Sequence, residues 1–133
     1  MNNNDIREDE INSRVKIIGS KNDIPIIYLK EFEQQTIEKT RLLWDRLDYL
    51  ANNNPFYLIA DLSTSAIPSS EVRFYVNQRH DAIRHLLLFV YIFIGSNFLF
   101  KITAKFMAAS ARVKNFKVIN DIQHGLDLIK NNT

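Results

Sequence analysis

The chain of 133 residues has room for one domain rather than two, and a domain of this length folds without a metal or disulfide to hold it. Its lack of cysteine excludes disulfides, thiol catalysis and cysteine-based zinc sites, and its three glycines exclude a glycine-rich phosphate-binding loop. A net charge of +2, from 17 Lys and Arg against 15 Asp and Glu, selects no class of partner.

The first 14 residues are rich in Asn and acidic side chains and contain no apolar stretch of the kind found in signal peptides. We therefore expect a disordered polar tail over residues 1–14, followed by a single domain over residues 15–133. The longest apolar run, Leu86 to Ile94, has nine residues, whereas a membrane-spanning helix needs about 20. No transmembrane segment and a cytoplasmic location are expected.

Two β-rich runs open the expected domain. Val15–Ile18 and Ile24–Tyr28 flank the turn-rich segment Gly19–Asp23, a pattern typical of a β-hairpin. Residues 31–50 lack Gly and Pro and carry apolar side chains every three or four positions, which predicts an amphipathic helix. Four acidic side chains are expected on the solvated surface of this helix: Glu31, Glu33, Asp45 and Asp48.

The rest of the chain alternates strands and helices. Residues 56–60 and 87–94 are continuously apolar, which is the pattern of strands covered on both faces, and the second of these is expected at the centre of the sheet. The remaining expected elements are helices that begin at Ser69 or Ser70, at Ser96 or Asn97 and at Asn120 or Asp121, and a short strand, Phe116–Ile119.

The expected order is thus an N-terminal β-hairpin followed by alternating helices and strands. This order predicts an α/β domain with a mixed, mostly parallel sheet, right-handed crossovers and surrounding helices. Helices on both faces would explain the two uninterrupted apolar strands. The N-terminal hairpin would supply an antiparallel edge.

The segment from Asp61 to Glu71 follows a buried strand and opens a helix, which is where α/β sheets bind ligands. A phosphate at a helix N-terminus gains from the free N–H groups and the helix dipole. The segment is therefore a candidate for phosphorylation at Ser69 or Ser70, or for binding an anion. Alternatively, its hydroxyl side chains are helix caps and turn formers. Five such side chains lie in it: Ser63, Thr64, Ser65, Ser69 and Ser70.

No other chemistry is indicated by the sequence. His80 and His85 lie five positions apart on one expected helix, about 140° around its axis, whereas a metal-binding pair needs a spacing of three or four. No nucleophile–base motif is recognised. We therefore expect no catalytic residue, no metal and no cofactor, and a protein that is not an enzyme. A hydrolase or transferase assembled from scattered Ser, Asp and His side chains is the competing hypothesis.

Residues 101–117 carry five basic side chains and no acidic one, interleaved with phenylalanines. Such a pattern binds single-stranded nucleic acid or an anionic surface in other proteins. Most of these phenylalanines also fit the apolar stripe of a helix or a strand, and the charges fit a solvated helix face. No nucleic-acid partner is therefore expected.

Two short motifs connect the chain to a known family. Ile59-Ala60-Asp61-Leu62-Ser63 is followed by Ile67-Pro68-Ser69-Ser70. Together with the order of elements, these residues resemble the STAS domain, and especially its SpoIIAA-like branch, over residues 15–130. In that family an apolar strand ends in Asp-Leu-Ser or Asp-Phe-Ser, and an apolar residue, Asp, Ser, Ser and Gly follow. Pro68 and Glu71 stand at the Asp and Gly positions of this pattern.

The resemblance implies a non-catalytic regulatory or protein-interaction module like the anti-sigma-factor antagonists. Ser69 matches their phosphorylated serine, and the implied partner is a regulatory kinase or an anti-sigma-like protein. A second copy of the chain, forming a homodimer, is a further candidate. The branch also includes proteins with an apolar pocket, related to the lipid-binding Sec14 domains, so binding of a small apolar ligand is the alternative function. The candidate partner loop comprises Asp61, Ser63, Ser69, Ser70 and Glu71.

Overall fold

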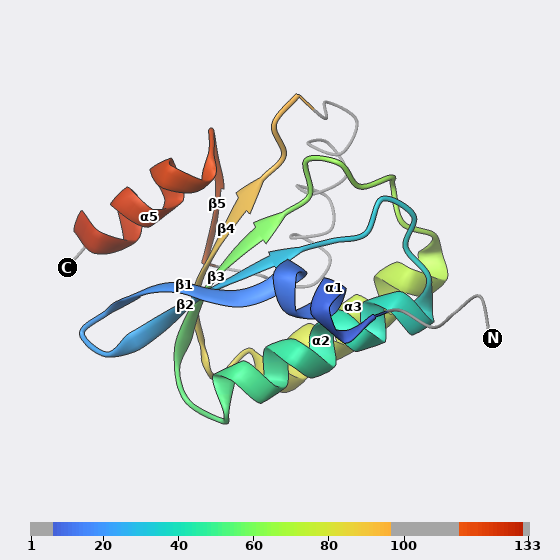
Figure 1. The fold of residues 1–133 in the computed structure, drawn as a ribbon, viewed down its shortest axis with the longest axis horizontal. Coiled ribbons are helices and arrows are strands. Elements are labelled where there is room, and N and C mark those ends of the chain that lie inside the picture. Colours follow the sequence, from blue (N-terminus) through green and yellow to red (C-terminus); the bar gives the residue numbers. More distant parts are fainter. Residues whose placement is uncertain (1–6, 97–114, 132–133) are drawn as a thin grey trace.

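Residues 7–96 and 115–131 are described by the computed structural model, and they have an α/β architecture (Figure 1). The strands are β1 (Val15–Lys21), β2 (Ile24–Lys30), β3 (Phe56–Asp61), β4 (Leu87–Phe93) and β5 (Phe116–Ile119). The helices are α1 (Glu8–Arg14), α2 (Ile37–Ala51), α3 (Ser70–Ile83) and α5 (Ile122–Asn131). The helix expected from Ser96 or Asn97 and most of the basic stretch 101–117 lie outside the described residues.

The five strands form one mixed sheet in the order β1-β2-β3-β4-β5. β1 pairs with β2 in antiparallel fashion, and every later neighbour is parallel, so the expected hairpin edge and mostly parallel sheet are confirmed. Asn22 and Asp23 close the hairpin with φ angles of 51° and 67°, the left-handed conformation that a two-residue turn of type I′ requires. The parallel register places Lys30 beside Asp61 and Asp61 beside Phe93.

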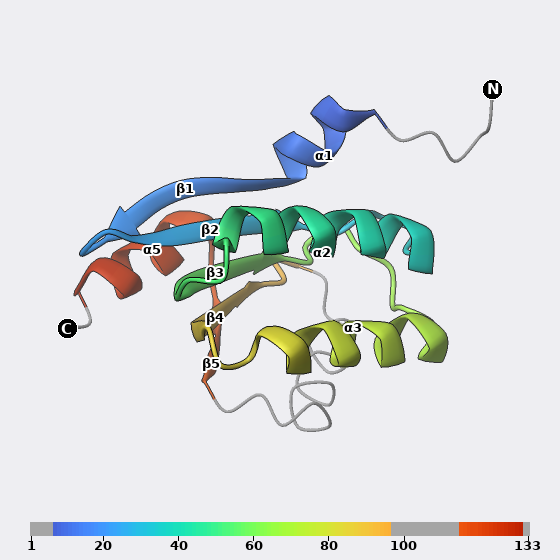
Figure 2. The same ribbon diagram turned by 90° about the horizontal axis from the view of Figure 1, so that it is seen from below.

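Helices cover both faces of the sheet, as expected from its apolar strands. α2 contacts β1, β2 and α3, whereas α5 lies on the opposite face against β1, β3 and β5 (Figures 1 and 2). Successive side chains of a strand point to opposite faces of the sheet, so each strand contributes side chains to both cores. The core under α2 includes Ile27, Leu29, Leu43, Phe56, Leu58, Val90 and Ile92. The core under α5 includes Ile26, Ile59, Tyr91, Ile119 and Ile129.

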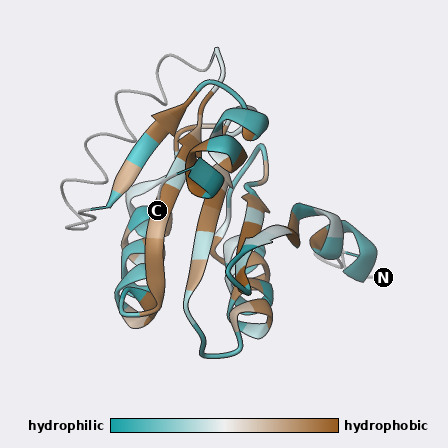
Figure 3. Ribbon diagram, turned by 90° about the vertical axis from the view of Figure 1, so that its left-hand side faces the viewer, coloured by the Kyte–Doolittle hydropathy of each residue, from teal (hydrophilic) through white to brown (hydrophobic). Residues whose placement is uncertain are grey.

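Hydropathy follows these layers in Figure 3, where the strands are mostly brown and the helices carry much of the teal. In the two strands expected to be covered on both faces, one large apolar side chain is exposed, because Leu88 at the start of β4 is 38% exposed. The register there shifts from Phe56 beside Leu87 to Tyr57 beside Phe89, which leaves Leu88 as an extra residue without a partner on β3. A bulge of this kind turns a strand residue out of its layer.

The approach of α5 to the sheet depends on Gly125. A Cβ at this position would lie 2.7 Å from Cδ1 of Ile119 and 3.2 Å from Cδ1 of Ile59. Both isoleucines are almost fully buried, so they have little room to move aside. The small-residue position is therefore what lets α5 sit close to β3 and β5.

The expectation of a disordered tail over residues 1–14 is wrong for its second half, because residues 8–14 form α1. The acidic side chains of its first turn and the basic Arg14 of its last turn suit the helix dipole. Ile11 is buried, and the Arg14 guanidinium lies 4.1 Å from the centre of the Phe32 ring and donates a hydrogen bond to the carbonyl of Glu31 (3.1 Å). These tertiary contacts stabilise a helix too short to form alone.

The second helix begins later than the expected residue 31. Thr36 is its N-cap, with its side-chain oxygen accepting a hydrogen bond from the Lys39 N–H (3.1 Å), and Ile37 is its first residue. Glu31 instead extends the line of β2, because its N–H donates to the carbonyl of Asp61 (3.1 Å). The helix ends at Ala51, where Asn52 takes a left-handed φ of 48°, close to the expected end.

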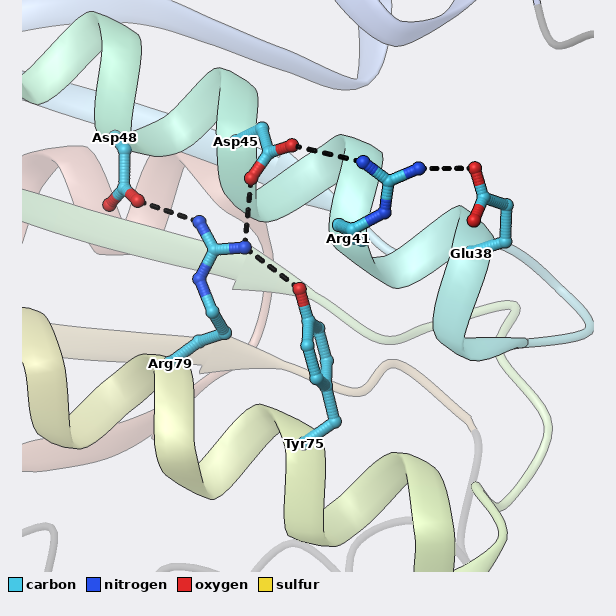
Figure 4. A network of polar contacts seen from close by, with 6 residues as sticks. All are labelled: Glu38, Arg41, Asp45, Asp48, Tyr75 and Arg79. Atoms are coloured by element: carbon cyan, nitrogen blue, oxygen red, sulfur yellow. Dashed lines mark hydrogen bonds and ion pairs between the residues drawn. The ribbon is translucent and has the colours of Figure 1, made fainter.

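α2 and α3 are joined by a polar network centred on Arg79 (Figure 4). Its guanidinium reaches from α3 to two carboxylates of α2, at 2.9 Å from Asp45 and 2.6 Å from Asp48, and also donates to the Tyr75 hydroxyl (2.8 Å). Arg41 extends the network along α2 by pairing with Asp45 and Glu38. Within the described ranges no helix combines the length and apolar character needed to cross a bilayer.

Candidate functional site

The loop between β3 and α3 begins at a buried carboxylate. Asp61, 5% exposed, ends β3 and accepts hydrogen bonds on both oxygens. The Tyr28 hydroxyl donates to Oδ2 (2.5 Å), and the backbone N–H and hydroxyl of Ser63 donate to Oδ1 (3.0 and 2.6 Å). Burial, reinforced by the bond to Asp61, raises the pKa of Tyr28, so this phenol remains a proton donor. Asp61 thus shapes the start of the loop.

Backbone hydrogen bonds fix the loop to the end of β4 and to the segment that follows β2. The Leu62 N–H donates to the Phe93 carbonyl, and the Ala66 N–H donates to the Glu33 carbonyl, both at 2.8 Å. A surface hollow of about 620 Å³ lies beside this part of the loop. Its lining is hydroxyl-rich and comprises Glu33, Gln34, Ser63, Thr64, Ser65, Ala66 and Ser96.

The far end of the loop is the N-terminus of α3. Ser69 is the N-cap, and its Oγ accepts a hydrogen bond from the Val72 N–H (3.2 Å). Ser69, Ser70 and Glu71 are exposed. Two large apolar side chains flank them in the sequence and are also exposed, Ile67 by 50% and Phe74 by 66%. Because residues three and four apart share a helix face, Phe74 lies on the same side of α3 as Ser70 and Glu71.

The structure therefore divides the five candidate residues into two groups. Asp61 and Ser63 are hydrogen-bonded to each other at the end of β3. Ser69, Ser70 and Glu71 form the start of α3, and none of them lines the hollow beside Ser63. The hydrogen bonds of the first group stabilise the start of the loop. The second group places exposed polar side chains near exposed apolar ones.

Glu31 is a notable side chain that the sequence interpretation misplaced. It was expected on a solvated helix surface but is 6% exposed, with its Oε2 buried and without a hydrogen-bond partner among the described residues. Burial raises its pKa to about 7, although nearby Arg14 opposes the shift. The signal was present in the sequence, because Ile27, Leu29 and Glu31 alternate as one face of a strand.

The three histidines have separate environments. His80 is buried on α3, burial lowers its pKa, and neither ring nitrogen has a partner among the described residues. His85 is exposed, and Nδ1 of His124 accepts a hydrogen bond from the Asn120 N–H (3.1 Å). In the parts of the chain that the structure describes, no three His, Cys, Asp or Glu side chains gather as metal ligands would.

Comparison of the chain with family models, with curated proteins and with solved structures finds no match. The resemblance to the STAS domain thus stays a prediction that rests on the two motifs and the order of the elements. What the structure adds is the α/β architecture itself, with a five-stranded mixed sheet and helices on both faces.

Proposed function

We propose that this protein is a non-catalytic regulatory module that binds a protein partner through the end of the 61–71 loop and the first turns of α3. The observation that carries the proposal is the exposure of Ile67 and Phe74 on either side of the Ser69–Glu71 segment. Exposed apolar side chains rimmed by polar ones are typical of protein–protein contacts. Asp61 and Ser63 support this surface by fixing the path of the loop.

A regulatory role for Ser69 fits its position. Its hydroxyl is exposed at a helix N-terminus, where added negative charge is favoured by the helix dipole. A phosphoryl group there would add roughly −1.5 to −2 charges beside the exposed carboxylate of Glu71. The surface offered to a partner would change from mixed apolar and polar to strongly acidic. The partner that this chemistry suits is a regulatory kinase or an anti-sigma-like protein, as the family resemblance implies.

Affinity capture from the source cells, with quantification of the same captured protein across variants, tests the proposal. Phe74→Ala should reduce capture several-fold, whereas Tyr49→Ala should not, because Tyr49 is also a large aromatic side chain and is 72% exposed, but it lies on α2. Ser69→Asp should alter capture and Ser69→Asn should not, because Asn keeps the helix cap without adding charge. A protein retained equally by all four variants would contradict the proposed surface.

The alternative function, binding of a small apolar ligand, requires a pocket with an apolar lining. A pocket does exist on the α5 side of the sheet, but part of its lining is basic. A purely apolar molecule would leave those charges unused.

A further inference from the structure

A pocket of about 570 Å³ lies where α1, β1, β2 and α5 meet, on the α5 side of the sheet. Its volume is within the range of small-molecule sites, which is about 300–1,000 Å³. Its residues fall into an apolar group and a polar group. The apolar group is Ile18, Ile122 and Leu126, and the polar group is Glu10, Ser13, Arg14, Lys16, Tyr28 and Lys30.

The three basic side chains of the pocket are not equally available. Arg14 is engaged, because it pairs with Glu10 (3.5 Å) and donates hydrogen bonds to the carbonyls of Lys30 and Glu31. Lys16 and Lys30 have no ion pair with any described residue. Lys16 lies with Nζ 5.9 Å from the centre of the Tyr28 ring, and Lys30 follows Tyr28 by two positions, on the same face of β2.

Two carboxylates lie close to the pocket, but neither forms an ion pair with Lys16 or Lys30. Glu10 pairs with Arg14, and both oxygens of the neighbouring Asp61 accept hydrogen bonds from Tyr28 and Ser63. Lys16 lies beside Tyr28 in the β1–β2 register, so Lys16 and Lys30 are diagonal neighbours on one sheet face, with Cα atoms about 7–8 Å apart. Two flexible ammonium groups at that spacing can both reach a single carboxylate.

The opposite part of the lining is apolar. Ile18, Ile122 and Leu126 pack against the core under α5, and the Tyr28 hydroxyl is occupied by Asp61, which leaves its ring toward the pocket. We propose that the pocket binds a single-chain amphiphilic carboxylate, such as a fatty acid. The carboxylate lies between Lys16 and Lys30, and the hydrocarbon chain covers Ile18, Ile122 and Leu126. This binding is independent of the partner surface on α3.

Isothermal titration of the purified full-length chain with decanoate, below the concentration at which it forms micelles, tests this inference. Acetate supplies the head group without the chain, and decanol supplies the chain without the charge. Decanoate should bind measurably, and acetate and decanol each at least about tenfold more weakly, because charge-assisted hydrogen bonds and chain burial each contribute more than about 1.4 kcal/mol. Acetate or decanol binding as tightly as decanoate would overturn the proposed ligand class.

The site itself is tested by a matched pair of double variants. Combined Lys16→Ala and Lys30→Ala should weaken decanoate binding about tenfold or more. Combined Lys117→Ala and Lys130→Ala removes two exposed lysines from β5 and α5, outside the pocket lining, and should leave the affinity unchanged. Circular dichroism checks that both variants fold. Absence of decanoate binding to the unaltered chain, or equal affinity in both double variants, would overturn the inference.

Discussion

Glu31 is the side chain whose chemistry the fold changes most. An unfolded glutamate ionises near a pKa of about 4.5, whereas burial in the folded protein raises the pKa of Glu31 to about 7. Below both pKa values the carboxyl is protonated in the folded and the unfolded state, so its ionisation does not change the free energy of unfolding. As the pH rises from about 4.5 to about 7, only the unfolded chain releases the proton, so the folded state loses stability.

Replacement of Glu31 by Gln should remove this pH dependence. We expect the free energy of unfolding of Glu31→Gln, relative to the unaltered protein, to rise by about 3 kcal/mol between about pH 4 and about pH 8. Urea denaturation at several pH values measures this difference. Glu33→Gln is the control, because it makes the same substitution two positions along the chain at an exposed side chain. If the difference in free energy of unfolding between Glu31→Gln and the unaltered protein did not change with pH, the raised pKa of Glu31 would be contradicted.

The residues of the candidate site show how far sequence reasoning reaches at this scale. The sequence predicts a helix cap at Ser69 or Ser70, and the N-cap is Ser69, because an N-cap depends mainly on local residue types. The burial of Asp61 depends on Tyr28, which lies 33 positions earlier and meets Asp61 only through the pairing of β2 with β3. No local pattern encodes that contact.

At the scale of the elements, the boundaries that tertiary contacts decide are those that the sequence did not predict. The apolar stripe of residues 31–50 identified α2 correctly but could not distinguish its first turn from the end of β2. α1 escaped prediction because its burial depends on one apolar side chain, Ile11, and on the stacking of Arg14 over Phe32. The alternation of strands and helices, by contrast, was sufficient to predict a mostly parallel sheet.

The packing of α3 on α2 should depend strongly on Arg79. Its side chain is only 18% exposed, and its two terminal nitrogens each bind one carboxylate of α2. We expect Arg79→Ala to lower the free energy of unfolding by about 1–2 kcal/mol, because Asp45 and Asp48 are half exposed and regain water when unpaired. Thermal or urea denaturation measures the loss.

Arg41→Ala provides the comparison for Arg79. Arg41 also contacts Asp45, but it is 46% exposed and pairs within its own helix. Its removal should cost less than about 0.5 kcal/mol. Equal losses in the two variants would show that the contact between α2 and α3 is not what makes Arg79 important.

At the scale of the whole molecule, the central strands belong to two cores at once. Leu58 packs under α2 and the next residue, Ile59, packs under α5. A disturbance on either face must therefore reach the other through the shared backbone of the sheet. The proposed partner surface on α3 and the proposed pocket beside α5 lie on elements that share this sheet, so they are expected to fold and unfold together.

This coupling predicts the behaviour of a variant on the α5 side. Ile129 is 1% exposed in the core under α5, and Ile129→Ala should lower the free energy of unfolding by about 2–5 kcal/mol. The single tryptophan, Trp44, lies in the other core and reports on α2. Its fluorescence and the far-ultraviolet circular dichroism should therefore give one coincident urea transition in the unaltered protein, shifted equally for both probes in Ile129→Ala. A circular-dichroism transition that moves to lower urea while the Trp44 transition stays in place would instead show that α5 detaches independently of the sheet.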